Sequence, residues 1–176
     1  MKRTMKPKIL VVDDDNSVRE SLRKLLATHG YDVLTAHDSA EALQHFESHT
    51  INLVVLDINL GAVDGWETFQ RMTVTNAFVP TVVITGEFGQ RERALTAGVE
   101  ALIEKPMDVP TFLEIIRTLL AETREERLKR VCEGKDFRYV GRSNEAFRRD
   151  LERRCSTPLK MPWFERLQLV TTTEKN

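Results

Sequence analysis

Residues 9–15 read Ile-Leu-Val-Val-Asp-Asp-Asp, so four apolar residues run directly into three carboxylates. A short, continuous and largely β-branched run of this kind is typical of a strand that is buried on both faces of a sheet. A similar pattern returns at residues 51–57, where Ile-Asn-Leu-Val-Val-Leu leads into Asp57. Two buried strands that each end in aspartate indicate a parallel sheet with acidic groups gathered at one edge.

Amphipathic stretches separate the apolar runs along the first 122 residues, and their apolar residues recur at helical spacing. Ser17 to Glu20 has the form of a capping box at the start of the first helix. Asp108 precedes the last helix, with Pro110 in its first turn. The predicted strands are residues 9–12, 31–36, 51–56, 81–84 and 101–104. Their alternation with helices predicts an α/β fold with five parallel strands covered on both faces.

Polar side chains stand at the carboxyl ends of four of these strands. Asp13 and Asp14 follow the first, Asp57 the third, Thr85 the fourth and Lys105 the fifth. In a parallel sheet these ends share the edge at which ligands bind. Clustered carboxylates repel one another unless a cation intervenes, and oxygen ligands suit Mg²⁺. Because a lysine and a hydroxyl can donate to phosphoryl oxygens, the set indicates Mg²⁺-dependent phosphoryl transfer to an aspartate.

A single aspartate after a strand is often only a turn former or a helix cap, and Asp15 is interpreted in that way. Thr85 or Lys105 alone would equally be an ordinary surface or strand-end residue. The argument therefore depends on the joint arrangement of specified residue types at four strand ends.

Composition limits the class of protein. The chain has 176 residues, of which 41% are hydrophobic and 30% charged, as is typical of a soluble globular protein. No run of 18 apolar residues is present, so we expect no membrane partner. Cys132 and Cys155 are the only cysteines, too few for a disulfide scaffold, which favours a cytoplasmic location.

Charge divides the chain near residue 122. Residues 1–122 carry 12 Lys and Arg against 18 Asp and Glu, whereas residues 123–176 carry 14 against 9. The net charge therefore changes from −6 to +5 at this point. We expect one domain at 7–122 and a basic C-terminal extension at 123–176.

The motifs of the first part resemble the receiver domain of bacterial two-component response regulators, of which the chemotaxis response regulator is the simplest member. The resemblance covers roughly residues 7–122. Its segments are Ile9-Leu10-Val11-Val12-Asp13-Asp14, Leu56-Asp57-Ile58-Asn59-Leu60 with Asp64-Gly65, Ile84-Thr85-Gly86, and Ala97-Gly98-Val99-Glu100-Ala101 leading to Lys105-Pro106.

The resemblance implies a flavodoxin-like, doubly wound sheet of order 2-1-3-4-5. It implies that Asp57 is the phosphoacceptor and that the cofactor is Mg²⁺. Asp14 and Asp57 would bind the ion directly, the backbone carbonyl of Asn59 would complete the protein ligands, and Asp13 would act through a water.

The resemblance also implies switch residues. Lys105 would pair with the phosphoryl oxygens, and Thr85 would move in to bond one of them. Asn59 and Glu87 stand where the family tunes hydrolysis of the aspartyl phosphate, although both could equally be plain loop residues. The bond before Pro106 would be cis. The chain departs from the family at Leu102, where an aromatic residue usually follows the movement of the threonine, and at Leu60-Gly61, where the family often has Met-Pro.

The extension is expected to be mostly helical or irregular. Residues 123–132 would prolong the last domain helix, with Thr123 and Glu126 in capping-box form. Residues 137–140 would be a short extended segment and 143–155 a basic amphipathic helix. One candidate helix is too few for a helix-turn-helix, so nucleic acid is not an expected partner.

The function expected from these features is that of a phosphorelay receiver. A sensor histidine kinase or a histidine phosphotransfer protein would donate the phosphate to Asp57, and the altered surface would signal to a further protein. The only catalysis expected is the domain's own phosphorylation and dephosphorylation. The alternative is a transcriptional regulator that binds DNA through the basic extension.

Two other functions fit less well. An aspartyl-phosphate phosphatase would carry a second acid two residues after the nucleophile, where this chain has Asn59. A flavodoxin-like carrier needs a glycine- and hydroxyl-rich phosphate loop after the first strand, where three acids would repel phosphate.

Overall fold

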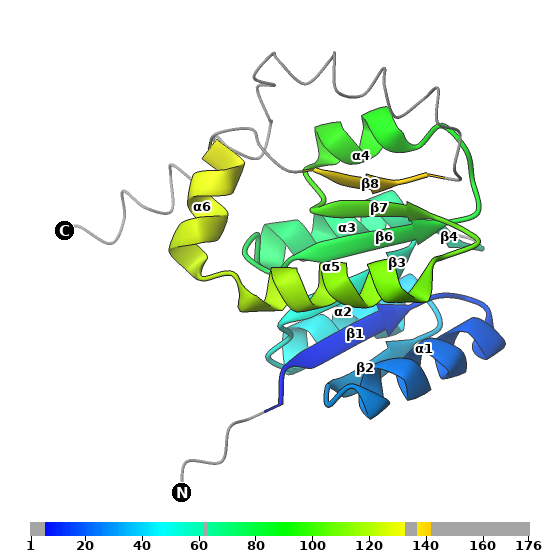
Figure 1. The fold of residues 1–176 in the computed structure, drawn as a ribbon. Coiled ribbons are helices and arrows are strands. Elements are labelled where there is room, and N and C mark those ends of the chain that lie inside the picture. Colours follow the sequence, from blue (N-terminus) through cyan, green and yellow to red (C-terminus); the bar gives the residue numbers. More distant parts are fainter. Residues whose placement is uncertain (1–5, 62, 133–136, 142–176) are drawn as a thin grey trace, which may run out of the picture.

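The apolar runs form the strands of one parallel sheet in the computed structural model, which describes residues 6–61, 63–132 and 137–141. The sheet has six strands in the order β2-β1-β3-β6-β7-β8 (Figure 1). Their bounds are β1 Lys8–Val12, β2 Asp32–Ala36, β3 Leu53–Asp57, β6 Thr81–Thr85, β7 Ala101–Glu104 and β8 Arg138–Val140. The order of the first five strands confirms the predicted 2-1-3-4-5 arrangement. The sheet has one strand more than the five predicted, because β8, which lies in the extended segment predicted at 137–140, pairs with β7.

Helices cover both faces of the sheet (Figure 1). One face is covered by α1 (Asn16–Thr28) and α5 (Val109–Ala121), and the other by α2 (Ser39–Ser48), α3 (Gly65–Thr75) and α4 (Arg91–Ala97). Successive residues of each strand point to opposite faces, so the core divides into two layers. Ile9 packs in the layer of α1 and α5, whereas Leu10 packs in the layer of α2 and α3.

Aspartate side chains cap most of the helices. Asp38 and Asp108 cap α2 and α5, with the latter at the predicted position. For α1 the predicted capping box was wrong: Asp15 is the cap, and its carboxylate accepts the amides of Ser17 and Val18 at 2.7 and 3.3 Å. Glu20 instead bonds Arg23. A charged acceptor one residue before the helix displaces the weaker hydroxyl cap.

The extension begins with a separate helix, α6 (Arg124–Cys132), and does not prolong α5. Glu122 is extended and ends α5. The predicted capping box is present: the Thr123 hydroxyl accepts the Glu126 amide at 3.2 Å, and the Glu126 carboxylate accepts the Thr123 amide at 2.8 Å. Because this box satisfies amides at a helix start, it explains why a new helix begins here.

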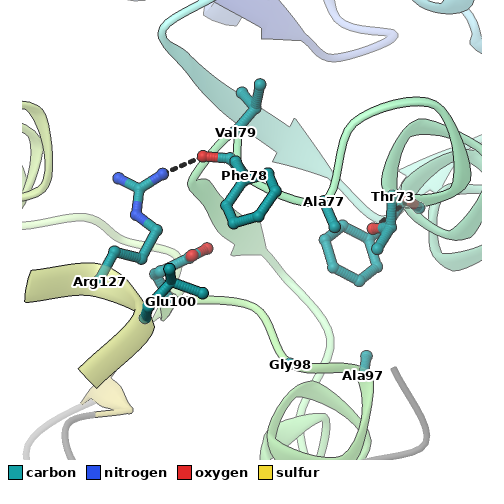
Figure 2. Close-up of a pocket in the computed structure, with 10 residues that line it drawn as sticks. Thr73, Ala77, Phe78, Val79, Ala97, Gly98, Glu100 and Arg127 are labelled. Carbon is teal, nitrogen blue, oxygen red and sulfur yellow. Dashed lines mark hydrogen bonds between the residues drawn. The ribbon is translucent and has the colours of Figure 1, made fainter. Parts of the chain in front are cut away.

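Arg127 fixes α6 against the amino-terminal edge of the sheet (Figure 2). Its guanidinium donates to the carbonyls of Phe78 and Leu119 and lies 3.7 Å from the Glu122 carboxylate. A pocket of about 310 Å³ beside it is bounded by the start of β3 and the end of α5. The expected helix at 143–155 lies outside the described residues. Within the described ranges, no helix is long and apolar enough to cross a bilayer.

Candidate functional site

The carboxyl edge of the sheet brings together the side chains that the sequence singled out. Asp13 follows β1, Asp57 ends β3 and Lys105 follows β7. The Lys105 ammonium donates to Asp13 Oδ2 at 3.0 Å and to Asp57 Oδ2 at 2.7 Å. The predicted cis bond between Lys105 and Pro106 is present. Three residues that lie as far as 92 positions apart in sequence therefore form one ionic cluster.

Both carboxylates are held on two sides. The Asn59 amide donates to Asp57 Oδ1 and the Asp15 amide to Asp13 Oδ1, each at 2.9 Å. In each carboxylate, one oxygen thus faces the backbone and the other faces the Lys105 ammonium. Such double anchoring fixes the direction of the Asp57 side chain.

Burial changes the electrostatics of the cluster. Asp13 is 2% exposed and Asp57 6% exposed. Burial raises the pKa of Asp13, although the hydrogen bond from Lys105 opposes that change. Burial alone would lower the pKa of Lys105, but its hydrogen bonds to Asp57 and Asp13 outweigh this effect, so its pKa is raised. One ammonium shared by two buried carboxylates leaves the cluster with an excess of negative charge that favours a further cation.

The candidate metal ligands are oxygen atoms only. Asp14 is exposed, and its Oδ2 lies 4.0 Å from where a Cβ on Gly61 would stand. Asp14, Asp13 and Asp57 give three carboxylates against one ammonium, a donor set that fits a hard divalent cation. Within the described residues, no three acidic, histidine or cysteine side chains are already gathered around one point. The Mg²⁺ ligand set therefore stays a prediction.

Thr85 is fully buried at the end of β6. Its hydroxyl accepts the backbone amide of Glu87 at 2.9 Å, which closes a tight turn after the strand. Its carbonyl accepts the Lys105 amide at 2.7 Å, so the ends of β6 and β7 are tied together. Glu87 is exposed, as is Asn59. The structure thus places Thr85 beside Lys105 along the same sheet edge.

The structure reveals a further network that the sequence analysis missed. The Trp66 indole donates to Gln90 Oε1 at 3.2 Å, and Gln90 Nε2 donates to Glu87 at 2.9 Å. Arg93 bonds Asp64 at 2.6 Å, with its guanidinium 5.4 Å from the Trp66 ring centroid. These contacts join the start of α3 to the loop before α4. Of these residues, the sequence had singled out Asp64, through its place in a family motif, and Glu87, but it gave no sign that they share a network.

The loop after Asp57 contains a short hairpin, β4 (Asn59–Leu60) paired with β5 (Val63–Asp64). Gly65 begins α3 directly behind it, and its amide bonds the Ile58 carbonyl at 2.9 Å. A Cβ on Gly65 would lie 2.6 Å from the Asp57 carbonyl oxygen. Only glycine permits this approach, which explains the Asp64-Gly65 pair in structural terms.

Comparison with known proteins identifies relatives of the part of the chain that carries this site. Residues 9–117 match the family described as "Response regulator receiver domain". The chain is 39% identical over 124 residues to "Response regulator MprA" of Mycobacterium bovis, an alignment that covers 69% of this chain and 54% of the relative. The MprA protein of Mycobacterium avium is 39% identical over 121 residues, covering 68% and 53%. The chain thus spans about half the length of these relatives.

Solved structures show the same fold. A "response regulator receiver domain protein (CheY-like)" from Methanospirillum hungatei is 30% identical with a TM-score of 0.65, covering 70% of this chain and 99% of that one. The receiver domain of NtrX from Brucella abortus is 29% identical with a TM-score of 0.61, covering 65% and 99%. The part of the chain that these structures share is the part that carries the ionic cluster.

Proposed function

Since the chain belongs to the response regulator receiver domain family, we propose that it is a phosphorelay receiver in which Asp57 accepts the phosphoryl group. The observation that supports this assignment most strongly is the position of the Asp57 carboxylate. It ends the central strand, is 6% exposed and is paired with Lys105 at 2.7 Å. The donor would be a sensor histidine kinase or a histidine phosphotransfer protein, as two-component signalling requires.

The chemistry follows from the groups around Asp57. A carboxylate oxygen of Asp57 attacks the phosphorus of the donor, the phosphorus–nitrogen bond of the phosphohistidine breaks, and the donor imidazole leaves. An aspartyl phosphate results. Lys105 donates to the phosphoryl oxygens and offsets their added charge. Because Asp57 is already aligned by the Asn59 amide, little ordering is needed before attack.

We propose that Asp14 and Asp57 hold Mg²⁺ directly, with the Asn59 backbone carbonyl as a further ligand and Asp13 acting through a water. When bound, the ion supplies charge neutralisation to the phosphoryl oxygens. The support is the all-oxygen donor set and the excess of carboxylates over ammonium at this edge.

Thr85 is proposed as the switch residue. Its hydroxyl bonds its own loop through the Glu87 amide in the arrangement described here. A phosphoryl oxygen on Asp57 would offer this hydroxyl a charge-assisted acceptor, and the loop after β6 would follow. Asn59 and Glu87 are proposed to set the rate of hydrolysis by positioning water.

The chain would therefore signal through a change of surface at its loops and helices, and its own phosphorylation and dephosphorylation would be its only catalysis. We propose residues 7–122 as the receiver domain and residues 123–176 as a basic C-terminal extension. Signalling to a further protein, a cytoplasmic location and the expected lack of nucleic-acid binding stay predictions. The alternative, a transcriptional regulator acting through the extension, depends on a segment of which residues 133–136 and 142–176 lie outside those described.

Incubation with acetyl phosphate and Mg²⁺ tests the proposal. The protein should gain one phosphate that is labile to base, as an acyl phosphate is. Asp57→Asn should gain none. Asp32→Asn is the matched control, because Asp32 is an exposed strand residue far from the ionic cluster. In the described part of the chain its ion pair is with Lys8. Equal phosphate incorporation by the Asp57→Asn variant would refute the assignment.

A further inference from the structure

The described part of the extension returns to the sheet next to the proposed switch. β8 pairs with β7 in parallel, with Leu102 opposite Tyr139 and Ile103 opposite Val140. The ring of Tyr139 therefore stands one strand away from Leu102, the residue that replaces the family's usual aromatic. Because the strands are parallel, the chain leaves β8 at the carboxyl edge of the sheet, where Asp57 lies (Figure 1).

Tyr139 contacts both elements that flank the switch. Its hydroxyl donates to Glu104 Oε1 at 2.7 Å, and its ring centroid lies 6.0 Å from the guanidinium carbon of Arg91. Glu104 is the strand partner of Thr85 and precedes Lys105 in the chain. Arg91 is the first residue of α4. One side chain of the extension thus contacts the strand that leads to Lys105 and the helix that follows Thr85.

Apart from the contacts of Tyr139, the described residues hold β8 through its pairing with β7 and through apolar packing of Phe137 and Val140 against the core. β8 has three residues and, within the part of the chain that the structure describes, pairs on one side only, with β7. Short edge strands open more readily than central strands, because fewer pairings and contacts hold them. The contacts of Tyr139 are therefore a substantial part of what keeps β8 on the sheet.

We propose that β8 is a state-dependent edge strand, held by Tyr139 in the resting arrangement and loosened when Asp57 is phosphorylated. This inference rests on the proposed function. In the resting arrangement Lys105 bridges Asp13 and Asp57, and the Thr85 hydroxyl bonds its own loop. Movement of Thr85 toward a phosphoryl group shifts the loop of residues 86–90 and the first turn of α4.

That movement weakens the hold on β8 in two ways. Arg91 travels with α4 and away from the Tyr139 ring. Glu104 is disturbed because the Lys105 amide is bonded to the Thr85 carbonyl at 2.7 Å. Burial, together with Glu104, raises the pKa of Tyr139 to about 12, so the phenol is a hydrogen-bond donor throughout the neutral range. The structural change caused by phosphorylation thereby reaches β8 and Gly141 at the carboxyl edge of the sheet.

Amide hydrogen exchange on the full chain, with and without beryllofluoride and Mg²⁺, tests the inference. Residues 86–98 report whether the phosphoryl mimic has bound at Asp57, and residues 137–141 report on β8. In the wild-type protein, exchange in 137–141 should become roughly 3- to 10-fold faster with the mimic, the factor expected for loss of about one hydrogen bond.

One tyrosine variant removes the hydrogen bond of Tyr139 but keeps its ring, and a second serves as the control. Tyr139→Phe keeps the ring but removes the donor to Glu104, so β8 should exchange faster without the mimic and respond little to it. By thermodynamic linkage, this variant should also bind beryllofluoride several-fold more tightly. Tyr31→Phe is the control, since Tyr31 lies beside β2 at the other edge of the sheet, and it should behave like wild type.

The outcomes distinguish the two proposals. A response in 86–98 with no change in 137–141 of the wild-type protein would overturn the role of β8 and leave the receiver function standing. No response in either region, together with no phosphate on Asp57, would overturn both.

Discussion

Replacing Gly65 by alanine tests the packing behind the proposed phosphoacceptor. The new Cβ would lie 2.4 Å from Ile58 Cα and 2.6 Å from the Asp57 carbonyl oxygen. Both neighbours are backbone atoms and cannot rotate away, so the end of β3 must move. Overpacking of this kind costs about 1–3 kcal/mol. The better helix propensity of alanine offsets at most about 1 kcal/mol of this cost, and less at the first residue of a helix.

We therefore expect Gly65→Ala to lower the free energy of unfolding by about 2 kcal/mol and to slow phosphorylation of the folded protein by acetyl phosphate. Urea unfolding measures the first effect through its midpoint, with the slope unchanged. Gly86→Ala is the matched control, because no atom lies within 4 Å of its added Cβ and its backbone is not left-handed. A Gly65→Ala variant within about 0.5 kcal/mol of wild type, the usual range of neutral substitutions, would refute the reasoning.

Three further predictions concern Arg127, which fixes α6 against the sheet, Tyr139 of β8, and the proposed metal site. Arg127→Ala should lose about 1–2 kcal/mol in urea unfolding, since it removes buried hydrogen bonds to carbonyls, whereas exposed Arg117→Ala should change little. In a Tyr31→Phe background, ultraviolet titration should place ionisation of Tyr139 near pH 12 rather than 10. Because this pKa is raised, the stability that it contributes is present below pH 10 and lost between pH 10 and 12. Mg²⁺ at 100 times its dissociation constant should stabilise the wild-type protein by about 2.7 kcal/mol. Asp14→Ala should lose most of that gain. A full gain in the variant would show that the proposed ligand set is wrong.

The sequence predicted the central fold well because its signals are local and mutually consistent. Buried strands such as residues 9–12 are continuous apolar runs, and the helices between them have a clear apolar side. Strand-end residues then fall at one edge by topology alone, which is why Asp13, Asp57 and Lys105 could be placed together. The first capping box failed because two candidate caps stand two residues apart, and a carboxylate at Asp15 competes with the Ser17 hydroxyl.

The parts that sequence reasoning missed depend on contacts between distant segments. The extended segment predicted at 137–140 is present as β8, but its pairing with β7 has no local signal in the sequence. The same holds for Tyr139, whose partners Glu104 and Arg91 lie 35 and 48 positions away. The Trp66–Gln90 bond likewise joins residues 24 positions apart. Ordinary polar residues acquire such roles only through tertiary structure.

The most direct test of the central claim is to locate the phosphate itself. After reaction with acetyl phosphate and Mg²⁺, borohydride reduction converts an aspartyl phosphate to homoserine, and peptide mass spectrometry identifies the converted residue. We predict homoserine at position 57 and an unmodified Asp13 and Asp14. Conversion at another aspartate, or at none while the protein stays folded, would contradict the account.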